Sequence, residues 1–440
     1  MPVNACQSAP RISAFTASCI VVANMVGTGV FTSLGFQVAA IPSPFALLAL
    51  WAVGGLGALC GALTYGELGA ALPRSGGEYN FLSRIYHPAV GFLSGWVSLT
   101  VGFAAPIALA AMAFAAYLGR VVPLAYPKVV AAALVCLVSA VHLAGVKAGA
   151  RFQVAFTVAK VLLILGFSVC GLLMADPQPL GLLPQAADLA AVFSGPFAVS
   201  LVFVSFAYSG WNAAAYIAGE MNDARRDLPK ALLAGTAVVA ILYVLLNFVF
   251  LRAAPLGELS GQLEVGYIAA SHIFGPEGGR LMAGLISLGL VSAISAMTWA
   301  GPRVTQTMGQ DIPLFRGLAV TRASGAPVRA ILLQLAIVLV LLFTATFESV
   351  LTFLGFTLAL STVLTVAGVF VLRWREPSLP RPYRTLGYPV TPLLFVAIEG
   401  WMLVYIFKTR PHESMAGLGT LLLGLLLYFP ASRKGLAKTP

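Results

Sequence analysis

Charged side chains are scarce in this chain. They make up 9% of its 440 residues, whereas soluble domains carry about 25%. Hydrophobic residues make up 59%, and the mean hydropathy is +0.93. So few charges cannot cover a surface that faces water. The composition therefore excludes a soluble protein and predicts one that is embedded in a membrane along its whole length.

Cysteine is also rare, and its five residues are scattered, without the paired spacing of a disulfide framework or a zinc site. No nucleophile–base pair or cluster of metal ligands occurs within an apolar stretch. We therefore expect neither an enzyme nor a bound cofactor or metal. The cysteines are Cys6, Cys19, Cys60, Cys136 and Cys170.

Long apolar runs fill most of the sequence, without the strict alternation of a membrane β-barrel. A helix needs about 20 residues to cross the hydrocarbon layer of a bilayer. Several runs are longer, which indicates tilt or extension beyond the membrane. We predict an all-α membrane protein, one transmembrane domain over residues 1–440 with twelve transmembrane helices. The spans are expected at approximately 11–39, 43–71, 88–118, 127–146, 150–174, 190–219, 229–252, 278–309, 327–345, 348–373, 388–408 and 414–430.

Positive charge is distributed unevenly between the loops. If the amino terminus is cytoplasmic, 19 of the 26 basic residues lie on or toward the cytoplasmic side, 6 lie on or toward the other side, and Lys160 alone lies mid-span. Cytoplasmic loops of membrane proteins are enriched in Lys and Arg. The asymmetry predicts a multi-pass protein with both termini in the cytoplasm. The net charge of +11 is therefore explained by membrane topology and by contact with anionic lipid, and does not indicate binding to nucleic acid.

Glycines interrupt the first and sixth spans near their middles, in residues 26–31 (VGTGVF) and 206–212 (FAYSGWN). Glycine is unfavourable in helices and permits backbone conformations that other residues avoid. The two spans lie five crossings apart, so they run in opposite directions through the membrane. Such a pair is typical of an inverted-repeat transporter with its site at the midplane. Close helix packing is the alternative role for these glycines.

The broken spans divide the chain into two predicted repeats of five helices. The first repeat covers helices 1–5 in residues 11–174, and the second covers helices 6–10 in residues 190–373. Helices 11 and 12, in residues 388–430, are appended. The polar and apolar mixture in residues 253–277 is expected to form a short helix over the outer mouth, as a lid.

Several motifs resemble the amino acid–polyamine–organocation (APC) superfamily, and most closely its L-type amino acid transporters. The resemblance runs in order from about residue 11 to 385. It implies a LeuT-like fold, a 5+5 inverted repeat with broken helices 1 and 6 that works by alternating access. The motifs are NMVGTGVF at 24–31, YGELG at 65–69, PRSGGEY at 73–79, FAYSGWN at 206–212, Gly219-Glu220 and Gly301-Pro302-Arg303.

The resemblance implies a substrate site at the two breaks. Backbone N–H groups at a helix amino terminus bind anions, so those of Gly27, Thr28 and Gly29 would hold an α-carboxylate. Unwound carbonyl groups would accept hydrogen bonds from the α-ammonium. Phe206 would close over the substrate as a gate, with ordinary aromatic packing as the alternative. The expected substrate-binding residues are Met25, Val26, Gly27, Thr28, Gly29, Phe206, Ala207 and Ser209.

Lys160 is expected to act in gating or coupling. A charge inside the membrane costs at least ~2.5 kcal/mol on insertion scales, so it usually has a functional partner. The resemblance places such a lysine beside the first span, where sodium-coupled relatives bind Na⁺, and pairs it with a seventh-helix tyrosine, here Tyr243. A fixed cation repels Na⁺, so we expect sodium-independent transport. Snorkelling to the interface and proton coupling through Lys160 are the alternatives.

Acidic residues are missing from the middles of spans 1, 3, 6, 8 and 10, which line the pathway in this fold. A cationic substrate side chain would have no partner there, so we expect neutral L-amino acids and favour exchange over proton symport. Glu399 lies midway along span 11, where a capped or dimer-facing carboxylate is expected, with a role in transport as the alternative. Glu67 and Glu220 are expected to form structural pairs at cytoplasmic helix ends.

The loop at 119–126 contains no cysteine. Animal L-type transporters are disulfide-linked to a single-span partner through this loop, so we expect a stand-alone transporter. We place it in the cytoplasmic (inner) membrane of a bacterium, with an amino acid and membrane lipid as its partners. A proton-coupled symporter is one alternative function. An amino acid sensor that does not transport is a second alternative.

Overall fold

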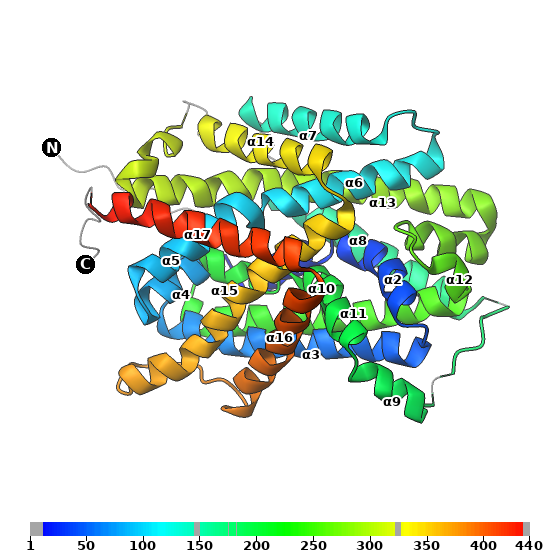
Figure 1. The fold of residues 1–440 in the computed structure, drawn as a ribbon, viewed down its shortest axis with the longest axis horizontal. Helices are drawn as coiled ribbons and strands as arrows, with labels where there is room; N and C mark the ends of the chain where they lie inside the picture. The colour runs from blue at the N-terminus through cyan, green and yellow to red at the C-terminus, as the bar shows by residue number, and fades with distance from the viewer. Residues whose placement is uncertain (1–11, 145–149, 175, 182, 322–326, 434–440) are drawn as a thin grey trace.

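The computed structural model describes residues 12–144, 150–174, 176–181, 183–321 and 327–433. Helices make up almost all of this part of the chain, and its β-structure is a single isolated bridge between Ile12 and Met221. Several long helices, among them α3, α13 and α17, run roughly along the long axis of the molecule (Figure 1). The helices are α1 (Ala14–Met25), α2 (Gly29–Ala40), α3 (Pro44–Ala71), α4 (Glu78–Ile85), α5 (Pro88–Val97), η1 (Ser98–Gly102), α6 (Ala104–Val121), α7 (Pro127–Leu143), α8 (Ala150–Leu172), α9 (Ala186–Val192), α10 (Gly195–Tyr208), η2 (Ala213–Glu220), α11 (Ala224–Ala253), α12 (Leu256–Leu259), α13 (Val265–Asp311), η3 (Pro313–Leu318), α14 (Val328–Thr344), α15 (Phe347–Arg375), α16 (Val390–Thr409) and α17 (Pro411–Arg433).

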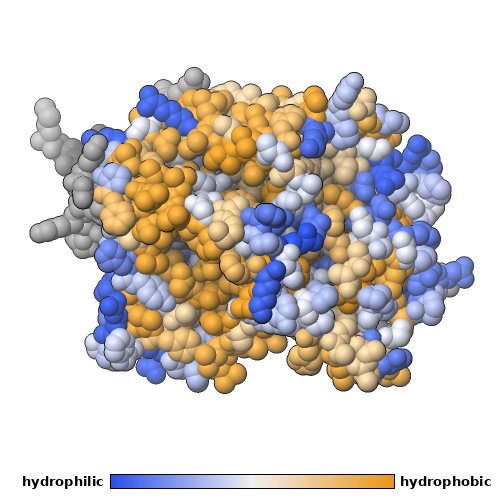
Figure 2. All heavy atoms as spheres, in the orientation of Figure 1, coloured by the Kyte–Doolittle hydropathy of each residue, from blue (hydrophilic) through white to orange (hydrophobic). Residues whose placement is uncertain are grey.

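Helices of transmembrane length dominate the structure. Among the described residues, eight helices are long and apolar enough to cross a membrane, and the bent pair of α1 and α2 makes a ninth. Three shorter apolar helices cover Pro127–Leu143, Thr157–Leu172 and Val328–Thr344. Hydrophobic residues cover much of the face seen in Figure 2. The all-α, multi-pass membrane fold is therefore confirmed. The count of twelve spans stays a prediction.

Helices of the two predicted repeats pack against each other in pairs. α3 packs against α11, α6 against α13, α7 against α14, and α2 against α10. In each pair, the two helices belong to spans with the same position in the first and second predicted repeats. Figure 1 shows α7 and α14 side by side at one edge of the molecule. This packing fits the predicted 5+5 arrangement, although the inverted repeat itself stays a prediction.

Charged residues pair in two separate groups. Each ion pair between described residues joins two residues that the predicted topology places on the same side of the membrane. This grouping is compatible with the predicted topology, which stays a prediction, as does the side that faces the cytoplasm. On the side predicted to be cytoplasmic, the pairs are Arg74–Asp311, Arg84–Glu376, Arg373–Glu67 and Arg381–Glu67. On the other side they are Arg120–Glu264, Arg280–Glu277 and Arg410–Glu348, and His272 Nε2 lies 2.8 Å from Glu258 Oε2 there.

Two predicted spans differ in detail from the observed helices. The third span is interrupted by the π-helical turn η1 between α5 and α6. The eighth span continues a helix that already begins at Val265 and is bent at Gly275, where φ is +80°. Hydropathy reports only whether a segment is apolar, so neither irregularity could be read from it.

Candidate functional site

The first span is broken where its glycines predicted. α1 ends at Met25, α2 begins at Gly29, and the two half-helices are bent by 41°. Val26 has φ −73° and ψ 85°, which ends the helix. The N–H groups of Gly29 and Val30 have no partner within α2, because the first N–H groups of any α-helix lack one, whereas that of Phe31 donates to the Thr28 carbonyl oxygen at 3.1 Å. The break therefore presents backbone donors and acceptors in the protein interior.

The sixth span is broken at the second predicted position. α10 ends at Tyr208, Ser209 adopts an extended conformation with ψ 148°, and Gly210 has φ +93°. This φ lies in the region that glycine occupies without strain. After the turn, the chain continues as the 3₁₀ helix η2 from Ala213 to Glu220.

The two breaks lie directly against each other. A Cβ atom added to Gly29 would lie 2.5 Å from the Cα of Ala207, and one added to Gly210 would lie 2.9 Å from the Cβ of Asn24. Thr28 and Phe206 are buried beside this contact, whereas Ser209 is half-buried. The structure thus brings together the residues predicted to bind substrate, Met25 to Gly29 in the first span and Phe206, Ala207 and Ser209 in the sixth.

Two side chains from other spans hold the carbonyl groups of the first break. The Tyr243 hydroxyl, in α11, donates a hydrogen bond of 2.6 Å to the Met25 carbonyl oxygen. The Lys160 Nζ, in α8, donates one of 3.3 Å to the Val26 carbonyl oxygen. Helix ends leave carbonyl groups without partners, and these two donors satisfy a consecutive pair of them. Lys160 therefore points to the break rather than to the membrane interface.

An aromatic cluster lies behind the break and was not predicted. The Tyr243 ring lies 5.1 Å from the Tyr208 ring and 5.7 Å from the Trp51 ring, measured between centroids. The Tyr208 hydroxyl donates to the Trp51 carbonyl oxygen at 3.2 Å, and Trp51 Nε1 donates to Gln37 Oε1 at 2.8 Å. Aromatic residues in apolar spans carry no sequence signal for such a cluster. It fixes the position from which Tyr243 reaches the break.

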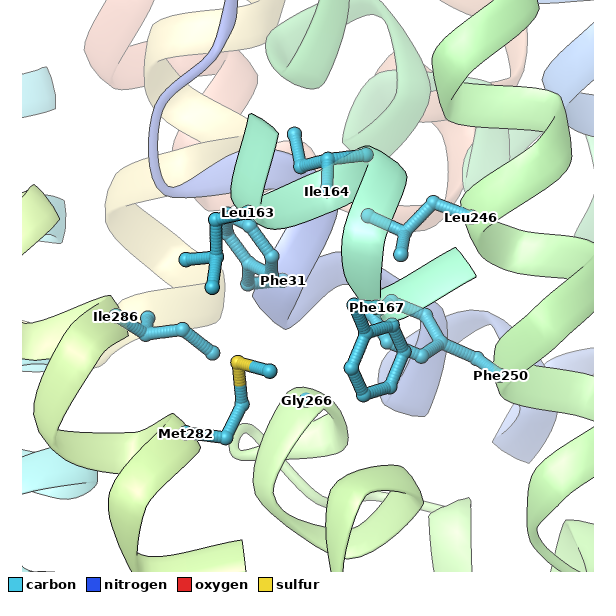
Figure 3. Close-up of a pocket in the computed structure, with 9 residues that line it drawn as sticks. All are labelled: Phe31, Leu163, Ile164, Phe167, Leu246, Phe250, Gly266, Met282 and Ile286. Atoms are coloured by element: carbon cyan, nitrogen blue, oxygen red, sulfur yellow. The ribbon is translucent and has the colours of Figure 1, made fainter. Parts of the chain in front are cut away.

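Lys160 lines a small pocket together with Val26 and Gly27 of the first break and Gly289 of α13. A second pocket adjoins it and shares Phe31, Leu163 and Ile286 with it. In Figure 3, Phe31, Phe167 and Met282 point toward the common space of this second pocket. All the residues that line the second pocket are apolar or glycine, so it could accommodate only an apolar group. They are Phe31, Leu163, Ile164, Phe167, Leu246, Phe250, Gly266, Met282 and Ile286.

The segment predicted as a lid packs on the second half of the first span. Residues 253–277 form α12 and the beginning of α13. The Gly261 N–H donates to the Gly35 carbonyl oxygen at 2.8 Å, and the Tyr117 hydroxyl joins the Phe31 carbonyl oxygen to the Gly266 N–H. The expected short helix is present, and its action as a lid stays a prediction.

Two acidic residues outside the breaks, Glu399 and Glu67, have structural partners. Ser205 Oγ, in α10, donates to Glu399 Oε1 in α16 at 2.9 Å, so the expected capping of Glu399 is observed. Arg373 donates two hydrogen bonds to the buried Glu67, at 2.8 and 2.7 Å, and the Thr385 N–H donates a third at 2.7 Å. The expected structural pairing of Glu67 is therefore confirmed.

These features define a class: a polytopic membrane protein in which two broken helices bring irregular backbone together in the interior. A sequence model of the family described as Amino acid permease matches residues 12–426. The chain belongs to this family, within the APC superfamily and close to the L-type transporters.

Relatives of known function share nearly the whole chain. Large neutral amino acids transporter small subunit 2 of Homo sapiens is 28% identical over 430 residues, which are 95% of this chain and 80% of the relative. Asc-type amino acid transporter 1 of Homo sapiens is 27% identical over 430 residues, 95% of this chain and 82% of the relative. Serine/threonine exchanger SteT of Bacillus subtilis (strain 168) is 26% identical over 423 residues, 94% of this chain and 95% of the relative. The family and these relatives support amino acid transport, rather than enzyme activity, as the general function.

Proposed function

We propose that this chain is a sodium-independent exchanger of neutral L-amino acids that works by alternating access. The observation that carries the proposal is the hydrogen bond of 3.3 Å from Lys160 Nζ to the Val26 carbonyl oxygen. It places a cationic side chain from α8 at the break of the first span.

The position of Lys160 supports sodium independence. Unwound carbonyl groups of broken helices coordinate Na⁺ in transporters of this architecture. Here the Val26 carbonyl accepts from an ammonium group, and the Met25 carbonyl accepts from the Tyr243 hydroxyl. Like charges a few ångströms apart repel strongly in a medium of low dielectric constant. A Na⁺ ion at these carbonyl groups would therefore be opposed by the lysine.

The breaks offer complementary groups to the two charges of an amino acid. The α-carboxylate would bind the N–H groups of Gly27, Thr28 and Gly29 at the amino terminus of α2. The α-ammonium would donate to the carbonyl groups of Met25, Phe206, Ala207 and Ser209. Those of Met25 and Phe206 already accept one hydrogen bond each, from Tyr243 and Ser209. A carbonyl oxygen has two lone pairs, so each can accept a second.

The surroundings of the breaks favour a neutral side chain on the substrate. The spans predicted to line the pathway have no carboxylate in their middles that could pair with a cationic substrate. Phe206 is buried at the second break, where it would close over the substrate as a gate. Ser209 is a small residue, so it does not decide between small and branched substrates.

We further propose a stand-alone transporter in a bacterial cytoplasmic membrane, with both termini in the cytoplasm. The connection between α6 and α7 carries no cysteine through which a partner could be linked. The bacterial relative SteT is described as an exchanger, which supports exchange as the mode of transport.

Uptake into proteoliposomes tests the proposal. Labelled leucine, alanine and arginine would be offered in sodium-free buffer, with and without unlabelled amino acid inside. We expect uptake of leucine or alanine only when internal amino acid is present, and no uptake of arginine. Uptake that requires a sodium gradient would contradict the role given to Lys160.

Proton-coupled symport is the second candidate, because Lys160 is a titratable group in contact with the break. It predicts uptake into vesicles without internal amino acid, stimulated by an inward proton gradient. The same vesicles, prepared with and without a pH gradient, separate the two functions.

A further inference from the structure

Glu78 is a buried carboxylate on the face predicted to be cytoplasmic, with 4% of its surface exposed. Three side chains donate hydrogen bonds to it. The Tyr65 hydroxyl donates to Oε1 at 2.9 Å, Asn212 Nδ2 donates to Oε1 at 2.6 Å, and the Tyr216 hydroxyl donates to Oε2. Hydrogen bonds to an ionised acceptor are about twice as strong as neutral ones, so this is a strong junction.

The three donors come from two different parts of the molecule. Tyr65 lies in α3, near the end that leads to α4. Asn212 and Tyr216 lie beyond the break of the sixth span, in the turn and in η2. Glu78, the first residue of α4, therefore joins the second half of the broken sixth span to the connection between α3 and α5.

Backbone contacts strengthen the same junction. The Gly76 N–H donates to the Tyr216 carbonyl oxygen at 3.3 Å, and the Gly219 N–H donates to Ser75 Oγ at 2.9 Å. The Tyr216 ring lies against Gly77, where an added Cβ atom would be 2.7 Å from the ring. Residues 75–78 thus contact both the turn and η2.

The other side of α4 is tied to the end of α13. The Tyr79 hydroxyl donates to Asp311 Oδ2 at 3.2 Å, and Arg74 forms an ion pair with Asp311 at 3.9 Å. The segment around Glu78 therefore bridges from the second half of the sixth span to the end of the eighth. These are spans that line the pathway in the proposed fold, so the bridge joins two of its walls at this face.

We propose that Glu78 with Tyr65, Asn212 and Tyr216 forms a latch that holds the second half of the sixth span closed on the cytoplasmic face. The bonds from Asn212 and Tyr216 break when the transporter opens on that face. This inference rests on the proposed function, because only alternating access requires the face to open. It makes Glu78 a positioning residue rather than a substrate ligand.

A carboxylate is well suited to such a latch. In the closed state, its charge is satisfied by three donors, as a buried charge must be. When the face opens, water solvates the exposed carboxylate, so the open state also satisfies its hydrogen bonds. The net difference between the two states is then small enough for one protein to populate both, as transport requires.

Hydrogen exchange of the intact protein in detergent tests the latch. The peptide covering residues 212–220 would be followed by mass spectrometry in the wild type, Glu78→Gln and Tyr216→Phe. Glutamine keeps the size of Glu78 but removes its charge. It also replaces one acceptor oxygen with an NH₂ group, which cannot accept hydrogen bonds from Tyr65, Asn212 or Tyr216. We expect exchange in this peptide to be about tenfold faster in Glu78→Gln, and faster to a smaller degree in Tyr216→Phe, because charge-assisted bonds are lost.

Glu376→Gln is the matched control. It removes the Glu376 carboxylate, which pairs with Arg84, also in α4, at 2.6 Å. This pair ties α4 to the end of α15 instead of to η2. We expect wild-type exchange in residues 212–220. Wild-type exchange in both Glu78→Gln and Tyr216→Phe would overturn the latch, and Tyr216→Phe decides alone if Glu78→Gln does not fold.

A transport readout separates a latch from a merely structural role. In Glu78→Gln, the cytoplasmic face opens more often, so the apparent KM for internal amino acid should fall and that for external amino acid should rise, each by about threefold. A change of both KM values in the same direction would overturn the proposal. Absence of uptake by the wild type would refute the transport function, while the hydrogen-exchange comparison would still decide whether Glu78 holds η2.

Discussion

The Tyr243 hydroxyl donates a hydrogen bond of 2.6 Å to the carbonyl oxygen of Met25, the last residue of α1. Lys160 holds the next carbonyl group, that of Val26, from α8. The broken first span is therefore held in place by two side chains from neighbouring helices. The shape of the proposed substrate site depends on residues that lie behind it.

Tyr243→Phe tests this dependence. Phenylalanine keeps the ring between Tyr208 and Trp51 but leaves the Met25 carbonyl without its donor. One hydrogen bond is worth ~1 kcal/mol, so we expect the exchange kcat/KM to fall about fivefold in proteoliposomes. The control is Tyr405→Phe in α16, whose ring packs on Trp401. An unchanged kcat/KM in Tyr243→Phe would argue against the anchoring role.

Lys160→Met tests the charge at the break. Methionine has a similar length but no charge and no donor for the Val26 carbonyl. We expect exchange to fall at least about tenfold, because a hydrogen bond from a charged group contributes ~1.5–3 kcal/mol. Lys160→Arg retains the charge and should keep more activity than Lys160→Met. Equal activity of the two variants would show that the charge is not needed.

The breaks and the role of Lys160 could be approached from sequence because each has a local signal. Gly27, Gly29 and Gly210 stand out within apolar spans, and Lys160 lies mid-span, whereas the other basic residues lie in loops or toward the ends of the predicted spans. Glycine changes the backbone at its own position, so the positions of both breaks followed directly. The apolar runs of the sequence also predicted the ends of most membrane helices to within a few residues.

The Glu78 latch had no such signal. Glu78 belongs to a motif, but its partners Asn212 and Tyr216 lie 134 and 138 residues away. Tyrosine and asparagine are common near helix ends, so only the fold shows that they meet. The contact of Ser205 with Glu399 was hidden in the same way, because it joins two apolar spans 194 residues apart.

Gly29→Ala and Gly27→Ala form a matched pair of tests at the first break. A Cβ on Gly29 would lie 2.5 Å from the backbone of Ala207, whereas one on Gly27 would meet only the Met25 carbonyl oxygen, at 3.9 Å. Overpacking costs ~1–3 kcal/mol, so Gly29→Ala should lower the thermal unfolding temperature in detergent. Gly27→Ala should keep wild-type stability but bind substrate more weakly, because the added methyl group hinders the carboxylate. Equal stability of the two variants would contradict the close contact between the breaks.

Gly210→Ala tests the second break. Its φ of +93° is strained for any residue with a Cβ atom, and that atom would lie 2.9–3.0 Å from Asn24. Strain of this kind costs ~1–3 kcal/mol, so we expect lower thermal stability and loss of exchange. Gly400→Ala, where an added Cβ atom meets nothing within 4 Å, is the control and should behave as wild type. Normal exchange by Gly210→Ala would show that this turn is not required.

Ser205→Ala and Glu399→Gln test whether the buried carboxylate of α16 acts in transport. Ser205, the residue directly before Phe206, donates from Oγ to Glu399 Oε1 at 2.9 Å. Alanine removes the donor and leaves a buried carboxylate unsatisfied, which costs ~1–3 kcal/mol, so Ser205→Ala should unfold at a lower temperature.

Glu399→Gln should have the opposite effect on stability. Glutamine keeps an oxygen that accepts from Ser205 and removes a charge that is costly inside the membrane. We therefore expect wild-type or higher thermal stability together with wild-type exchange, measured on the same preparation. Loss of exchange in a stable Glu399→Gln protein would instead mean that the charge itself takes part in transport. In that case a proton gradient should stimulate uptake by the wild type and have no effect on the variant.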